Sequence, residues 1–204
     1  MVALTFSVKL RVTKRETKGM NAPNEYSFQE LSPSTWEDFQ GLFESRGGPK
    51  NCWCMVWRNA PVRPAGLPEK EHKKACMKVR VFSGVPNGLI GYSRGTPAAW
   101  CSVAPKTTYK NLTGTLNTST ENVWSIVCFY VRKADQGQGF QRFLLHSAIE
   151  YAKSKGCTSI EAYPVERTSP SYRFMGFVDL FEEEGFSYLG EAGTRRKIYR
   201  KSLA

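Results

Sequence analysis

Short runs in which apolar and polar positions tend to alternate recur along the chain, and a period of two is typical of β-strands. Residues 25–31, 88–93, 97–103, 159–164 and 197–203 have this strand character. Arg94-Gly95 separates the second and third runs, which predicts a β-hairpin. Residues 122–131 (NVWSIVCFYV) are apolar on both faces, as in a central strand.

Four other segments have helical character. Ser34 and Glu37 have the spacing of a capping box, which predicts a helix from there to about residue 44. Pro68 begins a second helix, to about Phe82, with acidic residues first and basic residues later. Apolar residues at helical spacing predict a third helix over 138–154, and 172–184 is a fourth candidate. The order of elements predicts one mixed α/β (α+β) domain over residues 20–204.

Residues 1–19 are ambiguous. Positions 4–12 alternate like a strand, so this extension is either an added edge strand or disordered. It holds five basic residues and one acidic residue, a net +4 of the chain's +11, which leaves +7 for the rest. That charge permits nucleic-acid binding without favouring it, because an anionic cofactor or substrate fits equally well.

Composition narrows the class of protein. Hydrophobic residues make up 41% of the chain, enough for a sizeable core, and no apolar run is long enough for a membrane-spanning helix. We find no signal-peptide pattern and expect a cytoplasmic protein with reduced thiols. Only one pair of its six cysteines is close in sequence, so we expect no disulfide framework.

The strongest local feature is a glycine-rich turn, Gln136-Gly137-Gln138-Gly139-Phe140, between the long apolar strand and the third helix. Glycines allow a tight turn, and the N–H groups of a helix N-terminus suit a pyrophosphate. A P-loop would need Lys-Ser/Thr after its second glycine, and a dinucleotide fingerprint a third glycine. Both are absent.

This turn resembles motif A of the GNAT acetyltransferase superfamily, Gln/Arg-x-x-Gly-x-Gly/Ala. Gln136, Gly139 and Gln141 fall at its three defining positions, and Gln141 departs from the pattern. The order of elements and the terminal Glu-Glu-Glu-Gly185-Phe186 are also similar to that family. The resemblance covers nearly the whole chain from residue 25 to residue 203.

The resemblance implies a mixed, mostly antiparallel sheet of six to seven strands with about four helices. This sheet would split between its fourth and fifth strands to admit acetyl-CoA as cosubstrate. Backbone groups near Phe129, Tyr130 and Val131 would pair with the pantetheine arm. The pyrophosphate would be held by the turn and first helical residues, Gln136, Gly137, Gln138, Gly139, Phe140 and Gln141.

The catalytic acid and base are harder to predict. Many GNAT members carry a tyrosine acid four residues before the Gly-Phe glycine, where this chain has Phe181. Tyr172 and Tyr163 are substitutes. Glu161 is the first choice of base, because a charge in the strand 159–164 is expensive unless used or paired. The alternative is that Glu161 faces solvent or pairs with a Lys or Arg, and Glu166 is a second candidate.

Cys52-Trp53-Cys54-Met55-Val56-Trp57-Arg58 is the most unusual segment. It falls where GNAT proteins usually shape the acceptor site, and Trp100 ends a strand in the same region of that layout. Cys52, Trp53, Cys54, Trp57 and Trp100 are therefore expected to line an acceptor pocket or to lie in the core. Redox-active thiols are an alternative. A metal site is not expected, since a second close Cys/His pair is missing.

The sequence therefore predicts a GNAT-fold enzyme that moves an acetyl group from acetyl-CoA directly to an amine of a small molecule or peptide. Two alternatives stay open. One is an acetylating toxin that acts on aminoacyl-tRNA. The other is a non-catalytic module that senses acyl-CoA or binds nucleic acid. A monomer and a homodimer are both compatible with the chain, and no membrane partner is expected.

Overall fold

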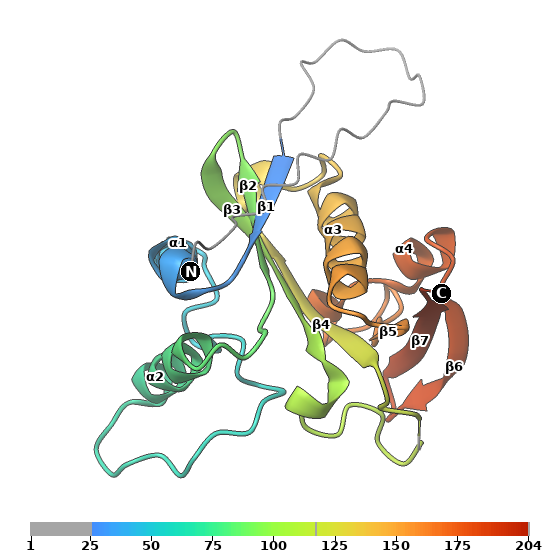
Figure 1. The fold of residues 1–204 in the computed structure, drawn as a ribbon, viewed down its shortest axis with the longest axis horizontal. Helices are drawn as coiled ribbons and strands as arrows, with labels where there is room; N and C mark the ends of the chain where they lie inside the picture. The colour runs from blue at the N-terminus through green and yellow to red at the C-terminus, as the bar shows by residue number, and fades with distance from the viewer. Residues whose placement is uncertain (1–25, 117, 204) are drawn as a thin grey trace.

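The computed structural model describes residues 26–116 and 118–203, so the extension predicted at 1–19 lies outside the described part. Seven strands form one sheet in the order β1-β2-β3-β4-β5-β7-β6 (Figure 1). The strands are β1 (Tyr26–Glu30), β2 (Leu89–Ser93), β3 (Thr96–Pro105), β4 (Val123–Val131), β5 (Ser159–Ala162), β6 (Ser187–Ala192) and β7 (Arg196–Ser202). Only β4 and β5 pair in parallel, and every other pair is antiparallel. The predicted fold class is confirmed.

Helices cover both faces of the sheet. Helices α1 (Trp36–Glu44) and α2 (Glu69–Phe82) lie on one face, and α3 (Phe140–Ser154) and α4 (Val178–Glu183) on the other (Figure 1). Alternate strand residues serve the two cores: Ile90 and Trp100 pack with the α1 side, whereas Leu89 and Cys101 pack with the α3 side. None of the described helices is both long and apolar enough to cross a bilayer.

Helix α1 starts differently from the prediction. A 3-10 turn, Pro33–Thr35, precedes it, and the cap is made by Ser32 and Thr35 instead of Ser34 and Glu37. The Ser32 N–H donates to Thr35 Oγ1 at 2.9 Å, and the Thr35 N–H donates to the Ser32 carbonyl at 3.1 Å. Pro33 explains the earlier start, because its fixed φ suits the first helical position.

The single helix predicted over 172–184 is wrong. The segment forms a 3-10 turn, Arg173–Met175, and the short helix α4, and Gly176 separates them. Gly176 has a φ of +92°, and a Cβ there would lie 2.8 Å from the Phe181 ring. Only glycine fits this position without strain, so the chain turns before α4 begins. Tyr172 consequently does not share a helix with Phe181.

A fork opens between β4 and β5. The two strands pair from Val123↔Ser159 to Ile126↔Ala162, where β5 ends, while β4 continues to Val131. Opposite β3, Ser102 pairs with Cys128 and Val103 with Ile126, so Val127 is an extra residue that forms a β-bulge. Beyond Ile126, no strand within the described ranges pairs with the β5-side edge of β4.

Candidate active site

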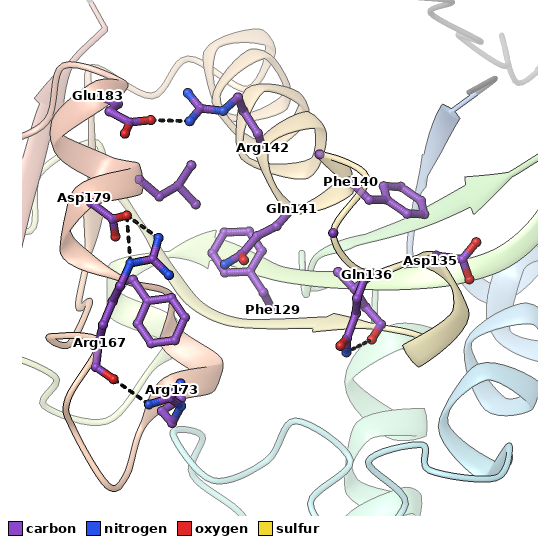
Figure 2. A pocket seen from close by; sticks show the side chains of 15 residues that line it. Phe129, Asp135, Gln136, Phe140, Gln141, Arg142, Arg167, Arg173, Asp179 and Glu183 are labelled. Carbon is purple, nitrogen blue, oxygen red and sulfur yellow. Dashed lines mark hydrogen bonds and ion pairs between the residues drawn. The ribbon is translucent and has the colours of Figure 1, made fainter. Parts of the chain in front are cut away.

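A cleft of about 660 Å³ lies on the α3 side of the fork, between the end of β4, the glycine-rich turn and α4 (Figure 2). Residues from both predicted cofactor segments line it: Phe129, Val131, Gln136, Gly137, Gly139, Phe140 and Gln141. Tyr130 and Gln138 are absent from this lining. Successive side chains of β4 point to opposite faces of the sheet. Tyr130, which follows the cleft-lining Phe129, therefore packs toward the α1 side and not into the cleft.

The turn before α3 has the shape of an anion cradle. Gly137 and Gly139 have φ values of +74° and +81°, and open space surrounds the position of a Cβ at each. The Gln136 side-chain amide donates to the Val131 carbonyl at 2.9 Å, which ties the turn to β4. No side chain caps α3. Its first N–H groups and the positive end of its dipole are therefore available to a pyrophosphate.

The opposite wall of the cleft is rich in arginine. Arg167 and Arg173 lie on the Phe177 ring, 5.0 and 4.9 Å from its centroid. Arg167 Nε also donates to Asp179 Oδ2 at 3.0 Å, and Arg142 pairs with Glu183 across the cleft (Figure 2). The carboxylates in this wall are thus already held by arginines. These ion pairs stiffen the cleft, and the carboxylates in them are poorly placed to accept a substrate proton.

Comparison with known proteins agrees with this geometry. The profile of the acetyltransferase (GNAT) family matches residues 55–177, more than half of the chain. The chain belongs to this family. Phe129, Gln136, Gly137 and Gly139, the cleft residues named above, all fall inside the matched region. No curated protein sequence matches the chain.

Several solved structures share the fold at low identity. An uncharacterised protein from Bacillus halodurans has a TM-score of 0.58 at 13% identity, with 88% of this chain and 84% of that chain covered. The acetyltransferase PaiA of Thermoplasma acidophilum, solved with coenzyme A, gives 0.51 at 14%, covering 87% and 98%. YncA of Salmonella typhimurium, solved with acetyl-CoA, gives 0.50 at 15%, covering 89% and 95%. Acetyl-CoA as cosubstrate is consistent with the family of this chain and with the ligands of these two neighbours.

Glu161 does not line the cleft. It is fully buried on β5, where Oε2 lies 2.8 Å from Lys106 Nζ and Oε1 pairs with Arg200. Tyr163 donates to the same carboxylate at 2.7 Å. Burial alone would raise the pKa of Glu161, but the hydrogen bonds from Lys106, Tyr163 and Arg200 hold it below its usual range. Glu161 is therefore paired with a lysine and an arginine, as the alternative to a catalytic role expected. The second candidate base, Glu166, is exposed and pairs with Lys197 at 2.7 Å.

The two tyrosine candidates lie in different environments. Tyr163 is fully buried, with its hydroxyl between Ser125 Oγ (3.0 Å) and Glu161. Tyr172 is half-buried at the 3-10 turn before α4, with its ring centroid 6.1 Å from that of Trp57. Arg196 lies over both rings, 4.4 Å from Trp57 and 5.5 Å from Tyr172. The structure therefore groups Tyr172 with Trp57, which was predicted for the acceptor pocket, and Tyr163 with Glu161.

Residues of the Cys-Trp-Cys segment differ in burial, from the core residue Trp53 to the half-buried Cys52 and Trp57. Trp53 and Trp100 are core residues and not pocket walls, since they are 2% and 0% exposed and pack on the α1 phenylalanines. Cys52 is half-buried, and its thiol donates to the Pro49 carbonyl at 3.4 Å. Trp57 is half-buried with Tyr172. Within the two described ranges, no three His, Cys, Asp or Glu residues are placed to hold a metal ion.

Two residues near the fork escaped sequence analysis. Cys128 was hidden in an apolar strand, and Arg58 followed the unusual Cys-Trp-Cys segment without a recognisable partner. Arg58 is fully buried, and Cys128 sits beside the bulge of β4. Cys54 of the segment lies in the buried cluster against which Cys128 packs, and its Sγ accepts a hydrogen bond from Trp100 Nε1 at 3.3 Å. No local sequence signal could have placed Cys54 and Cys128 together, because they are 74 positions apart.

Proposed function

We propose that this chain is an N-acetyltransferase that moves the acetyl group of acetyl-CoA directly to an amine of a small molecule or peptide. The observation that carries the proposal is the cleft at the glycine-rich turn, whose lining includes Phe129 and Val131 on the stretch of β4 that β5 leaves unpaired beyond Ile126. An extended pantetheine arm would pair with this edge as an added strand, near Phe129, Tyr130 and Val131.

The arrangement supports transfer by positioning. The phosphate turn fixes one end of the cofactor, and β4 directs its other end into the fork. When bound, acetyl-CoA supplies an activated thioester. The protein orients this group toward the sheet face that carries Trp57 and Tyr172, where an acceptor amine would enter. Holding both reactants in attack geometry accounts for much of the acceleration in such a reaction.

Calorimetric titration with acetyl-CoA and CoA tests the cofactor site. We expect saturable binding to the wild type and its loss in Gly139→Trp, because the indole would fill the open turn. Gly156→Trp is the matched control: this glycine also has a positive φ (+80°) and open space, but it lies outside the cleft lining. Both variants carry the same backbone strain, so binding by neither, or by both, would contradict the assigned site.

Acceptors are then found by thiol release from acetyl-CoA with a panel of amines: spermidine, tryptamine, a glycyl peptide and a lysine peptide. Release above the rate without protein, with mass-spectrometric detection of the acetylated amine, is the expected outcome. Wild-type protein that binds acetyl-CoA yet acetylates none of these amines would contradict catalysis of amine transfer and favour the sensor alternative.

A further inference from the structure

An arginine at the fork is held by two aromatic rings. Arg196, the first residue of β7, is only 9% exposed. Its guanidinium carbon lies 4.4 Å from the centroid of the Trp57 ring and 5.5 Å from that of the Tyr172 ring. We call Trp57 and Tyr172 the aromatic pair. Cation–π contacts of this kind fix the position of a guanidinium group.

One edge of this guanidinium is free. Nη1 of Arg196 donates to the Leu112 carbonyl at 2.9 Å, and Nε and Nη2 donate to none of the residues that the structure describes. These two nitrogens are not sealed in the protein, because the enclosed nitrogens without a partner in the described chain belong to Trp57, Arg58 and Arg80. The Nε–Nη2 edge carries two parallel N–H groups, which suit both oxygens of a carboxylate.

Arg196 also lacks a counter-ion within the described ranges. The carboxylates of β5, of the segment after it and of α4 already have cationic partners, which are Lys106 and Arg200 for Glu161, Lys197 for Glu166 and Arg167 for Asp179. Burial lowers the pKa of Arg196, and the phenols of the two tyrosines beside it act weakly in the opposite direction. A buried cation without a counter-ion is unfavourable, so an anionic ligand would stabilise this site.

Three further cations lie beside the aromatic pair. Arg173 follows Tyr172, Arg195 precedes Arg196, and the Lys110 N–H donates to the Trp57 carbonyl at 2.8 Å. Their side chains donate to neutral oxygens, namely the carbonyls of Val56, Arg167 and Ser169 and the hydroxyl of Ser171. Among the described residues, no carboxylate pairs with any of the three. Such a group of cations attracts an anionic acceptor and repels a polycation.

Strand pairing places Arg196 at the fork. Val165, three residues beyond the end of β5, bridges both Arg196 and Phe177, and Phe177 lines the cleft. The aromatic pair packs in the same cluster as Val127, which belongs to the stretch of β4 that β5 leaves unpaired. The arginine and its aromatic pair therefore border the opening toward which the thioester would be directed.

We propose that the acceptor is a small amine that also carries a carboxylate, such as a free amino acid, and that this carboxylate binds the Nε–Nη2 edge of Arg196. This inference rests on the proposed acetyl transfer and narrows its acceptor. In an α-amino acid the amine and the carboxylate share one carbon atom, so a carboxylate fixed at Arg196 also fixes the direction of the amine. Acetylation removes the charge of the amine and leaves the carboxylate, so the product keeps this contact.

The first test compares matched acceptors with the full wild-type chain. Thiol release is measured with L-tryptophan, L-phenylalanine and L-methionine, each against its decarboxylated amine and its amide, with rates expressed per concentration of free amine. We expect at least one amino acid to exceed both matched compounds in kcat/KM by roughly tenfold or more, as a hydrogen bond to a charged group contributes. Equal or better use of the compounds without a carboxylate in all three sets overturns the inference.

The second test measures binding without chemistry. The N-acetyl derivatives of the same amino acids and their N-acetyl amides are titrated calorimetrically in the presence of CoA. The two compounds of each pair have nearly the same shape and differ in charge. We expect at least one acid to bind roughly tenfold tighter than its amide. Equal binding in every pair overturns the inference without recourse to any variant.

Substitution of Arg196 separates recognition from folding. Arg196→Gln should raise the KM of the preferred amino acid by roughly tenfold or more and leave that of its decarboxylated amine within about threefold. Arg196→Lys keeps the charge and loses the two-pronged edge, so its KM should lie between those of Arg196→Gln and the wild type. Arg46→Gln, at an exposed arginine after α1, is the control and should behave as wild type. A purely structural role would impair both acceptors equally.

The outcomes separate the two proposals. Loss of acetyl-CoA binding in the wild type, or no thiol release with any amine or amino acid, overturns the proposed function. Turnover of amines without preference for a carboxylate overturns the carboxylate site alone. With saturating acetyl-CoA, inhibition by sodium phosphate that is much stronger than by sodium acetate at equal ionic strength would also overturn it, because the cations would then serve a phosphate-bearing acceptor such as RNA.

Discussion

At the scale of single residues, Glu161 is a buried carboxylate in the otherwise apolar strand β5. A carboxylate inside an apolar strand is either used or paired, and the sequence alone left both interpretations open. The structure shows Lys106 and Arg200 on the same carboxylate, with Tyr163 as a third donor. Paired charges of this kind stabilise only as a set, because the removal of one leaves the others buried and uncompensated. We therefore assign Glu161 a structural role.

Glu161→Gln should lower the free energy of unfolding at pH 7 by on the order of 3 kcal/mol, because Lys106 and Arg200 lose their counter-ion. Since the folded-state pKa is depressed, the stabilisation is fully present above the unfolded value near 4.5 and is lost as the pH falls through the folded value. The difference between the two proteins should therefore shrink in acid. Denaturant unfolding at pH 7 and pH 3 measures it.

The control for this variant is Glu150→Gln on the exposed side of α3, which should stay within about 0.5 kcal/mol of the wild type. If Glu161→Gln is as stable as the wild type but loses turnover without losing acetyl-CoA binding, the original interpretation of Glu161 as the base is restored.

At the scale of elements, the contact between α3 and β2 sets where the glycine-rich turn lies. A Cβ on Gly91 of β2 would be 2.9 Å from both Leu144 Cδ2 and Phe140 Cε2 of α3. Phe140 is the first residue of α3, and its ring also stacks on Tyr26 at 4.1 Å. The N-terminus of α3 can therefore pack this closely on the sheet only because Gly91 has no side chain.

Gly91→Ala should destabilise the protein by about 1–3 kcal/mol, the usual range for overpacking, and should weaken acetyl-CoA binding because α3 is pushed off the sheet. Gly41→Ala in α1 is the matched control. Its Cβ would meet nothing within 4 Å, so it should stabilise by up to about 1 kcal/mol through helix propensity. Thermal unfolding and calorimetry check both effects, and an unchanged Gly91→Ala would contradict the tight seating.

At the scale of the molecule, the net charge of +11 bears on the acceptor. An RNA-borne acceptor would lose affinity steeply with salt, by about 10³–10⁵ between 50 and 200 mM for six to ten phosphate contacts. For a small amine we expect KM to change less than about threefold over the same range. Steady-state kinetics at several salt concentrations measures the slope, and a steep one would favour the aminoacyl-tRNA alternative.

Much of the fold followed from local patterns. The hairpin at Arg94-Gly95, the apolar strand β4 and the helix after Gly139 were all predicted close to their observed bounds. The failures have specific causes. Pro33 moved the start of α1, and the positive φ of Gly176 broke the expected 172–184 helix. For Trp53 and Trp100 the sequence left a pocket and the core open, because it cannot tell which flat side chain meets α1; the structure places both in the core.

The sequence by itself determined the family, the fold and the glycine-rich turn, because these depend on neighbours within a few residues: alternation, helical spacing and glycine. The tertiary structure alone decided the partners of the ionisable groups. Strand register places Arg200 opposite Glu161, and Lys106 from the turn after β3 pairs with the same carboxylate. Cys128 of β4 likewise packs against the cluster that holds Cys54. Such contacts join residues far apart in the chain, and their energies depend on burial and distance, which no local pattern encodes.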